Sequence, residues 1–578
     1  MGPPSMNFVH YILLSLFSSG AMAQGDTIPT YHSGGFRAPL DVPILLAGSF
    51  GEPRPGHFHM GMDLQTLEKE GLPVYALGDG YVSRIGVSPY GYGNALYITY
   101  PNGFTSVYGH LQGFGEKITA LVRKEQYAKE SFSVDITVKP YELNVKKGEV
   151  VAFSGNTGAS GGPHVHFEIR DVAERTINPL LFGYTMSDHI APVIGGLKVY
   201  PMDALKHTAD GYRSPLAIVK GSYSPKTGLL KVNASSIALA INTYDKMEGT
   251  THTLGIYDIK AYDGDSIIHE YRVDRVTFDH TRDVIAQVDY PVFIKEGSRA
   301  FHKCFQEANN KIPSSYYHVR NNGVIDLSDG TVHNIKIEVR DYNGNLSTLR
   351  AQVQYDPKTV TFKAKPLKYN KVLSPYQDNN YSADGFNISI PGKALLDSMF
   401  VTYSSTPSTT NGIFSNVHKF GESQDQLLNY FTVSVKPVSL PENLKSKALI
   451  IWRNAGGGTA ARSSKWEGDM LTARSREFGS YFIMIDTTPP RIVPINITPG
   501  KNMHAAKAVY MRLSDGLSGL DEYKAYIDDK WQLMEMDGKT ATLKMFLPNT
   551  LTAGEHTFKL TATDERGNKA EYSVKFNY

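Results

Sequence analysis

The chain has 578 residues, a formal net charge of +2 and a single cysteine, Cys304. This length exceeds what one hydrophobic core organises, so several domains are expected. The balanced charge and the absence of a basic run argue against a nucleic-acid partner, and one cysteine excludes an intrachain disulfide. The 35 Tyr and 26 Phe, with frequent Gly, Pro and Thr, favour β structure.

The N-terminal segment 1–23 is typical of a secretory signal peptide. Residues 11–17 form a short apolar core, and Ala21-Met22-Ala23 is a small-x-small cleavage site. A positively charged n-region is missing, and Met6 is an alternative start. No later apolar run is long enough to span a membrane. We therefore expect an exported protein of the periplasm or cell envelope, without a transmembrane segment after cleavage.

The first polar cluster is His59, Gly61 and Asp63, in the spacing His-x-Gly-x-Asp. An imidazole and a carboxylate at this spacing are potential metal ligands. His57 could compete as a ligand but lacks the Gly-x-Asp spacing. Arg54 precedes the cluster, and could bind a substrate carboxylate or simply be solvated; the second interpretation is favoured.

His110 ends the apolar segment Val107-Tyr108-Gly109-His110-Leu111. Taken alone, a histidine here is best explained as a cap at the end of a strand. The segment that follows has apolar residues at helical spacing over 118–131. Phe132 to Val138 then alternate apolar and polar residues as a strand does.

The most informative segment is Gly161 to Ile169, in which His164 and His166 are separated by one residue. On a strand, alternate side chains share a face, so both histidines and Glu168 point one way and Val165, Phe167 and Ile169 point into the core. Two imidazoles on one face can both bind a metal, or one can bind it while the other acts as a base. Glu168 could support a metal-binding histidine or pair with Arg170.

Together these clusters resemble the LytM/lysostaphin-type zinc metallopeptidases over residues 36–182. The family's first motif is matched by His59, Gly61 and Asp63, its middle histidine by His110 and its final His-x-His by His164 and His166. The glycine-rich approach is matched by residues 145–150 and 154–158. The family also implies an antiparallel β catalytic domain with a zinc groove. The insertion after Leu111 departs from the pattern and puts the shape of the groove in doubt.

The resemblance implies that His59, Asp63 and His166 bind Zn²⁺, and that His110 and His164 are catalytic without binding it. Zinc lowers the pKa of its water to about 7, and that water attacks an amide carbonyl. His164 then takes the proton of the water, and His110 donates to the oxyanion that forms.

The remaining sequence predicts further β domains with boundaries near 188 and 487. The first boundary is marked by Asp188 and Pro192, and the second by the run Asp486-Thr487-Thr488-Pro489-Pro490. Residues 334–341 and 557–564 are alternating strands, each ending in an Asp-x-x-Gly-Asn turn before another strand. This repeat resembles the closing hairpin of bacterial immunoglobulin-like domains, so β-sandwiches are expected at 189–355 and 488–578. Residues 356–487 are β-rich without a recognisable fold. The turn aspartates could bind calcium, although turn chemistry alone explains them.

The sequence therefore predicts a mainly β protein with a peptidase domain at 24–188, in a multidomain form of the Bacteroidetes type. We expect a zinc endopeptidase that cleaves peptide cross-links of peptidoglycan. The alternative is a non-enzymatic envelope scaffold, or an activator of other wall hydrolases, in which the β-sandwiches bind. An envelope protein could bind these C-terminal domains in either case. Few core contacts are expected to cross the boundary near residue 188.

Overall fold

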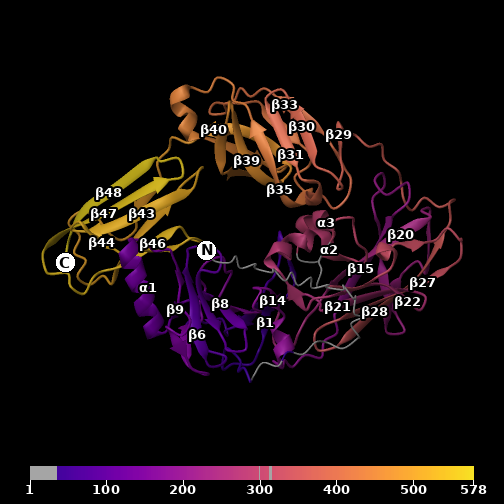
Figure 1. Ribbon diagram of the computed structural model, residues 1–578, viewed down its shortest axis with the longest axis horizontal. Helices are drawn as coiled ribbons and strands as arrows, with labels where there is room; N and C mark the ends of the chain where they lie inside the picture. Colours follow the sequence, from indigo (N-terminus) through magenta and orange to yellow (C-terminus); the bar gives the residue numbers. More distant parts are fainter. Residues whose placement is uncertain (1–30, 32–34, 298–299, 311–314) are drawn as a thin grey trace, which may run out of the picture.

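The computed structural model describes residue 31 and residues 35–297, 300–310 and 315–578. The predicted signal peptide, 1–23, lies outside the described residues. Four β-rich units follow one another along the chain and close into a ring around an opening (Figure 1). Among the described residues, no helix is both long and apolar enough to cross a membrane.

The first unit is built on an antiparallel sheet with β13 (His164–Arg170) near its centre. Val165, Phe167 and Ile169 are fully buried on one face of β13, as the alternation predicts. The sheet order is β1 (Leu46–Gly48), β4 (Met62–Gln65), β13, β8 (Thr105–Leu111), β7 (Asn94–Thr99), β6 (Gly80–Val87) and β10 (Val134–Thr137). Short additions are β2 (Pro53–Arg54) with β3 (His57–Phe58), β5 (Pro73–Tyr75) with β12 (Val150–Phe153) and β9 (Gly113–Phe114), and β11 (Asn144–Val145) on β6.

The insertion after Leu111 forms the predicted helix and strand. Helix α1 covers Glu116–Lys129 and buries Ile118 and Val122. Strand β10 then pairs antiparallel with β6 at the edge of the sheet. The insertion therefore adds to the edge of the sheet rather than to its centre.

The second unit contains two sheets and four short helical segments among its described residues. The smaller sheet holds β16 (Tyr212–Ser214), β15 (Val193–Pro201), β20 (Ser236–Tyr244), β24 (Phe301–Lys303) and β26 (Ile325–Asp326). The larger holds β17 (Leu216–Val219), β18 (Ser222–Pro225), β19 (Leu229–Val232), β28 (Leu346–Tyr355), β27 (His333–Arg340), β21 (Asp258–Asp263), β22 (Ser266–Arg272) and β25 (Tyr316–Val319). The helical segments are η2 (Phe278–Asp283), α2 (Val284–Gln287), α3 (Tyr290–Glu296) and η3 (Asn321–Gly323).

Packing between the first two units differs from the expectation of few contacts. One hydrophobic core runs without interruption from Leu40 to Phe362. Strand β14 (Thr176–Ile177) joins β13 to β23 (Arg275–Val276) of the second unit. The two units therefore pack as one body, because the sheet of the first continues into the second.

The third unit has its own core and two five-stranded sheets. One sheet is β30 (Asn379–Ala383), β31 (Phe386–Ile390), β35 (Gln426–Val435), β39 (Met470–Glu477) and β38 (Ser464–Glu467). The other is β33 (Tyr403–Thr406), β34 (Val417–Phe420), β40 (Gly479–Ile485), β36 (Ala448–Arg453) and β37 (Thr459–Arg462). A third, two-stranded sheet pairs β29 (Lys371–Leu373) with β32 (Met399–Val401).

The fourth unit packs two four-stranded sheets around a separate core. They are β41 (Arg491–Pro494), β42 (Ala508–Ser514), β46 (Thr542–Phe546) and β45 (Glu535–Asp537), and β44 (Lys530–Gln532), β43 (Leu520–Ile527), β47 (Glu555–Asp564) and β48 (Lys569–Asn577). Both predicted repeat hairpins form, as β27–β28 and β47–β48. That this unit and residues 189–355 are immunoglobulin-like stays a prediction.

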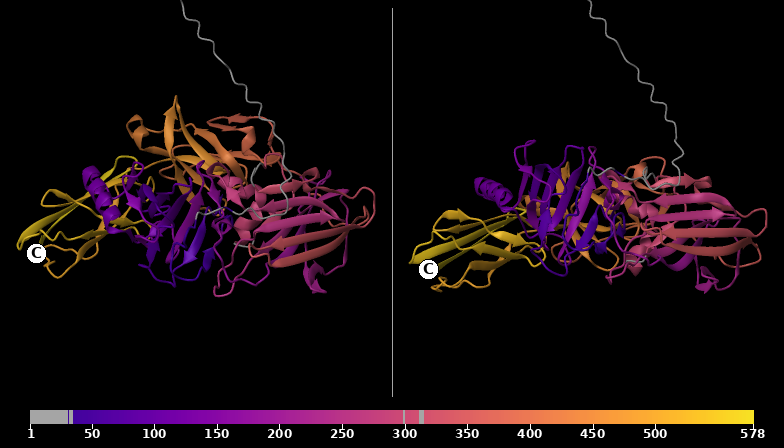
Figure 2. Two further views of the ribbon diagram at one scale, coloured as in Figure 1. Left: turned by 60° about the horizontal axis from the view of Figure 1, so that its bottom comes forward. Right: turned by 90° about the horizontal axis from the view of Figure 1, so that it is seen from below.

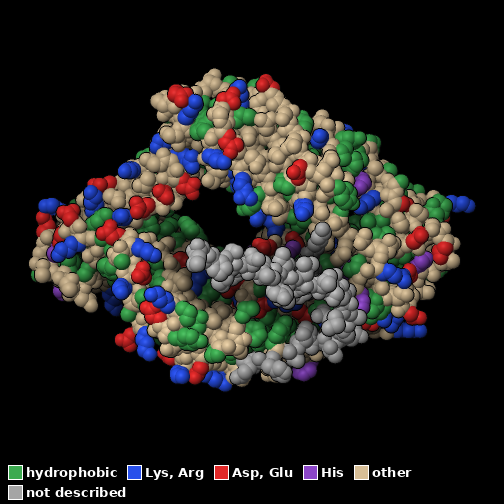
Figure 3. All heavy atoms as spheres, viewed as in Figure 1, with side chains coloured by type: hydrophobic (Ala, Val, Ile, Leu, Met, Phe, Trp, Pro, Cys, Tyr) green, Lys and Arg blue, Asp and Glu red, His purple; other side chains and the backbone are tan. Residues whose placement is uncertain are grey.

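The ring closes because the fourth unit returns to the first (Figures 1 and 2). Arg123 of α1 forms an ion pair with Glu535, with a nitrogen–oxygen distance of 2.7 Å. Tyr127, one turn further along α1, packs edge-on against Trp531. The space-filling view shows the opening that remains, with several Lys and Arg side chains along its upper rim (Figure 3).

Candidate active site

The centre of the site is a cluster of three buried side chains on adjacent elements. Asp63 on β4 and His166 on β13 are direct partners in the antiparallel register, and His59 follows β3. The distances are 3.0 Å from His59 Nε2 to His166 Nδ1, 3.1 Å from His59 Nε2 to Asp63 Oδ1 and 3.0 Å from His166 Nδ1 to Asp63 Oδ1. The structure thus brings together three of the predicted residues from two motifs about 100 positions apart.

Gly61 allows this close approach. A Cβ atom at this position would lie 2.5 Å from the carbonyl oxygen of Phe167 and 2.9 Å from His166 Cε1. Real Cβ atoms essentially never come so close to a backbone atom. The glycine of the first motif is therefore required by the packing of the 59–63 segment against β13.

Each histidine of the cluster has one ring nitrogen occupied by an acceptor. His59 Nδ1 donates to the carbonyl oxygen of Ser49 at 2.8 Å, and His166 Nε2 donates to Glu168 Oε1 at 2.9 Å. The remaining nitrogens, His59 Nε2 and His166 Nδ1, then carry lone pairs that face Asp63 Oδ1 in the neutral rings. Two imidazole lone pairs and a carboxylate oxygen converging on one point form the donor set that Zn²⁺ prefers, so these residues fit that ion.

The charges of the cluster are strongly coupled. Burial alone would raise the pKa of Asp63, but the charge of His59 and hydrogen bonds from His164 and His166 outweigh it and hold the pKa well below its usual value. Burial would lower the pKa of His166, but Asp63 and Glu168 raise it to about 9. A metal ion at this point therefore competes with a proton on His166.

Glu168 does both things that the sequence left open. It is fully buried, accepts from His166, and forms an ion pair with Arg170 at 2.7 Å. The hydroxyl of Tyr92 also donates to Glu168 Oε1, at 2.5 Å. Tyr92 could not be found from the sequence, because it lies in the turn before β7 and meets Glu168 of β13 only in the folded chain, 76 positions later.

His110 and His164 lie beside the cluster, with ring centroids 4.9 Å apart. His164 Nδ1 donates to the carbonyl oxygen of Gly162 at 2.8 Å, and its Nε2 lies 3.4 Å from Asp63 Oδ1. His110 Nδ1 donates to the carbonyl oxygen of Thr157 at 2.8 Å. Burial and the nearby His166 and His164 lower the pKa of His110 to about 3. Both rings therefore present a bare Nε2 when neutral.

This tautomer changes the role expected for His110. With Nδ1–H bound to a carbonyl, neutral Nε2 accepts a hydrogen bond, and it donates to an oxyanion only after it has gained a proton. His110 also has a φ of 60°, a conformation that costs energy for a residue with a Cβ and is concentrated at functional sites.

Two neighbouring residues considered from the sequence lie differently. Arg54 is not simply solvated: Nη2 lies 2.5 Å from Asp63 Oδ2 and also pairs with Glu52. His57 is exposed, and its Nδ1 contacts the carbonyl oxygen of Pro55 outside the cluster.

The fourth unit reaches the rim of this site, which the sequence did not suggest. Lys539 Nζ donates to the carbonyl oxygen of Asn156 and lies 3.4 Å from that of Ser160. Ser160 Oγ lies 3.2 Å from His164 Nδ1. The loop between β45 and β46 therefore contacts the segment that carries a candidate catalytic histidine.

Comparison with known proteins identifies the segment that holds this site. Residues 57–130 and 132–179 match the model of peptidase family M23. This part of the chain is an M23 peptidase domain. The third unit is a different case: residues 370–486 match the Zu5-like domain. That match covers most of 356–487, the segment left without a fold from sequence, so the C-terminal part is not uniformly immunoglobulin-like.

The M23 domain has named relatives in several bacteria. It is 34% identical over 122 residues to DD-carboxypeptidase/endopeptidase Mpg of Neisseria meningitidis, covering 21% of this chain and 22% of the relative. It is 36% identical over 111 residues to peptidoglycan DD-endopeptidase ShyB of Vibrio cholerae, covering 19% and 20%. The chain thus spans about a fifth of the length of these curated relatives. The catalytic domain of the M23 protein EnpA from Enterococcus faecalis is matched over its whole length and 28% of this chain, with 25% identity and a TM-score of 0.19.

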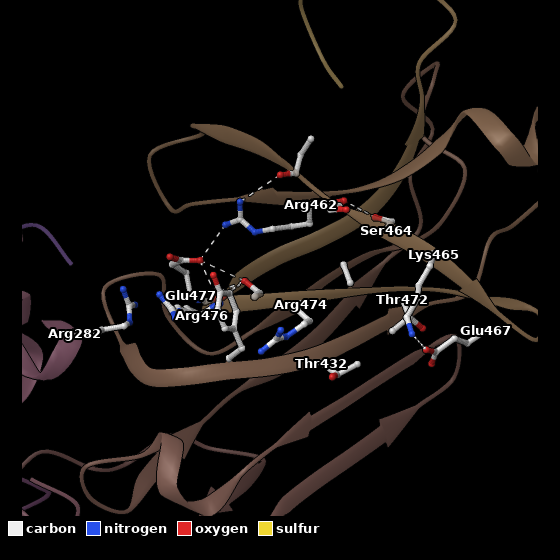
Figure 4. Close-up of a pocket in the computed structure, with 15 residues that line it drawn as sticks. Arg282, Thr432, Arg462, Ser464, Lys465, Glu467, Thr472, Arg474, Arg476 and Glu477 are labelled. Atoms are coloured by element: carbon white, nitrogen blue, oxygen red, sulfur yellow. Dashed lines mark hydrogen bonds and ion pairs between the residues drawn. The ribbon is translucent and has the colours of Figure 1, made fainter. Parts of the chain in front are cut away.

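A separate basic pocket lies where the second unit meets the Zu5-like unit (Figure 4). Its volume is about 790 Å³, and five cationic side chains line it against two carboxylates. The cations are Arg282, Arg462, Lys465, Arg474 and Arg476, and the carboxylates are Glu467 and Glu477. Burial and the nearby charge of Arg476 lower the pKa of Arg282. The pocket therefore has an excess of positive charge that an anionic ligand would relieve.

Proposed function

We propose that this protein is an exported zinc metalloendopeptidase that hydrolyses peptide cross-links of bacterial peptidoglycan. The observation that carries the proposal is the convergence of His59 Nε2, Asp63 Oδ1 and His166 Nδ1 on one point, beside two further histidines whose Nδ1 atoms bind backbone carbonyls. The M23 relatives named as DD-endopeptidases support the substrate class. Peptidoglycan lies in the cell envelope, so we propose that the enzyme acts there.

In this proposal His59, Asp63 and His166 hold the zinc. When bound, Zn²⁺ supplies Lewis-acid chemistry that polarises a carbonyl group and makes a water acidic near neutral pH. Ser49 and Glu168 fix the orientation of the two imidazoles through their second nitrogens. Arg54, beside Asp63 Oδ2, keeps that carboxyl ionised.

We assign proton transfer to the two remaining histidines. Hydrolysis adds the hydroxyl of a water to the carbonyl carbon and its proton to the leaving amine. Nε2 of His164 or His110 accepts that proton, and the protonated ring then donates it to the amine. The intact set of five side chains favours this enzyme over a non-enzymatic scaffold.

We also propose that the basic pocket binds carboxylates of the wall peptides. Four arginines and one lysine in one depression match a ligand with several carboxylates, since guanidinium groups bind carboxylates with two hydrogen bonds. Replacing Arg474 and Arg476 together by Gln should weaken sacculus binding, whereas Lys436→Gln on the same unit should not. Unchanged sacculus binding with loss of an envelope-protein contact would assign the pocket to a protein partner instead.

The direct test uses a defined cross-linked muropeptide dimer. The full-length protein should cleave it to monomers, lose this activity when a chelator removes the metal, and regain it with one equivalent of Zn²⁺. His164→Ala should retain bound zinc without activity. If the wild-type protein binds zinc but leaves the dimer intact, the site has lost its activity and the scaffold alternative gains support.

A further inference from the structure

A second cluster of three carboxylates lies where the M23 domain meets the second unit. Asp188 precedes β15, Asp245 follows β20, and Asp341 lies in the turn between β27 and β28. One oxygen from each residue lies within 4.8 Å of the other two. All three residues are at least 94% buried, with exposures of 6%, 4% and 4%. Three buried carboxylates so close together repel one another unless a cation or protons separate them.

The chain does not supply that cation. In the described part of the chain, none of the three carboxylates forms an ion pair with Lys or Arg. Asp188 Oδ1 accepts from the backbone N–H of Ile190, and Asp341 accepts from the backbone and side chain of Asn345. Asp245 Oδ1 is buried and has no hydrogen-bond partner. An ionised oxygen in this position is an uncompensated buried charge, which strongly destabilises the fold.

The raised pKa values of two of these aspartates agree with the absence of a nearby positive charge. Burial and the charges of Asp341 and Asp188 raise the pKa of Asp245 to about 8. Burial also raises the pKa of Asp188 to about 6, with further contributions from Glu248 and Asp341. With no cation present, Asp245 therefore holds a proton at neutral pH.

Space for an ion is present at the same point. A cavity of about 30 Å³ is lined on one side by the three aspartates with Ser49, Gly255 and Asn343, and elsewhere mostly by apolar and aromatic side chains. A volume of about 10–15 Å³ already holds one water-sized particle, so the cavity has room for one ion. The charged groups that line it offer only oxygen ligands, which suits a hard cation such as Ca²⁺ rather than zinc.

A second cluster of the same kind lies at Asp486, Asp515 and Asp564, within the described residues. In each copy, one asparagine side chain bridges two of the aspartates. Asn345 Nδ2 donates to Asp341 Oδ2 at 2.7 Å and to the carbonyl oxygen of Asp188 at 3.1 Å. Asn568 Nδ2 donates in the same way to Asp564 Oδ2 at 2.7 Å and to the carbonyl oxygen of Asp486 at 2.9 Å. The repeat shows that this is a built arrangement and not a chance meeting of acidic residues.

The two copies differ in how their middle aspartate is satisfied. Asp515 is partly exposed, and its Oδ2 accepts from the backbone N–H groups of Leu517 and Gly519. Asp245, its counterpart, is buried and has an oxygen without a partner. The need for a cation is therefore greater in the first copy, and the second provides an internal control.

We propose that Asp188, Asp245 and Asp341 bind one Ca²⁺ ion, which fixes the M23 domain against the second unit. Ser49 connects this site to the zinc site: its Oγ accepts from the N–H of Gly255 at 2.8 Å, and its carbonyl oxygen accepts from His59 Nδ1 at 2.8 Å. The calcium ion holds the segment that orients His59, although the calcium site itself does not depend on the peptidase activity.

The test uses full-length protein, freed of metal and resupplied with one equivalent of Zn²⁺ so that the zinc site is filled. Calorimetric titration with CaCl₂ should show one site in the wild type and in Asp515→Asn, and none in Asp245→Asn. Calcium at about 100 times its Kd should raise the first unfolding midpoint of the wild type by roughly 4–8 °C. It should not move that of Asp245→Asn.

A further measurement separates calcium binding from a purely structural role. Because Asp245→Asn replaces a buried carboxyl that must hold a proton when calcium is absent, its calcium-free form should unfold at least as high as the calcium-free wild type. The proposal is overturned if calcium neither binds nor shifts the wild-type midpoint, or if Asp245→Asn binds calcium as the wild type does. A calcium site lost in Asp515→Asn but kept in Asp245→Asn would also contradict it.

Discussion

Glu168→Gln tests how the zinc site is held in place. The substitution keeps the size of the side chain, but removes the charge that faces His166 Nε2 at 2.9 Å and Arg170 at 2.7 Å. Loss of a partner that orients a metal-binding histidine typically lowers metal affinity 10–100-fold, which corresponds to about 1.4–2.7 kcal/mol. We expect a decrease of this size in zinc affinity.

The same substitution should also destabilise the fold. Arg170 is 5% exposed and would lose its buried partner, which typically costs 3–5 kcal/mol. Arg170 keeps an ion pair with Glu174 at 3.1 Å and its position over the ring of Phe278, so we expect a loss of about 3 kcal/mol.

Zinc affinity is measured by competition with a chromophoric chelator, and stability by urea unfolding. Tyr92→Phe is the matched control, since it removes one hydrogen bond to Glu168 and leaves the carboxylate in place. It should lower stability by about 1 kcal/mol and change zinc affinity less than threefold. Wild-type zinc affinity in Glu168→Gln would refute the argument that this carboxylate orients His166.

Three further outcomes are expected. Zinc should be lost in each of the variants His59→Ala, Asp63→Ala and His166→Ala, whereas His164→Ala should keep zinc and lose activity by about two orders of magnitude or more. Metal analysis together with a cleavage assay measures both properties. Zinc lost in His164→Ala but kept in His166→Ala would contradict the assignment. Gly61→Ala, whose Cβ would lie 2.5 Å from the carbonyl oxygen of Phe167, should cost about 1–3 kcal/mol in urea unfolding, and Gly161→Ala, which meets nothing within 4 Å, should cost much less. A chain ending at Tyr184 should fail to fold, because the truncation removes part of the core that runs to Phe362, whereas a chain ending near residue 366 should fold and bind zinc. Circular dichroism measures whether each chain is folded. A chain ending at Tyr184 that is folded and zinc-loaded would show that the M23 domain folds independently.

The catalytic cluster could be predicted from sequence because its information is local. His164 and His166 alternate with apolar residues, which defines the strand and the face on which they lie. His59 and Asp63 are recognisable by the glycine between them, and the structure gives the reason for that glycine. The helix and the strand of the insertion were likewise predictable from apolar spacing.

Contacts between distant segments could not be predicted in this way. The tautomer of His110 depends on the carbonyl of Thr157, 47 positions away, and the contact of Lys539 with Asn156 spans 383 positions. The continuous core of the first two units depends on the pairing of β14 with β23, two-residue strands that carry no periodic pattern. The sequence shows the repeat that places Asp341 and Asp564 in equivalent turns. It does not show that each of them lies beside two further aspartates in the folded protein.

The central claim is most directly tested on purified sacculi. Full-length zinc-loaded protein should release uncrosslinked muropeptides, with new free amines and intact sugars detected by mass spectrometry. Chelator-treated protein should release none. New reducing ends without new amines would contradict the account, because they would show cleavage of glycan rather than of peptide cross-links.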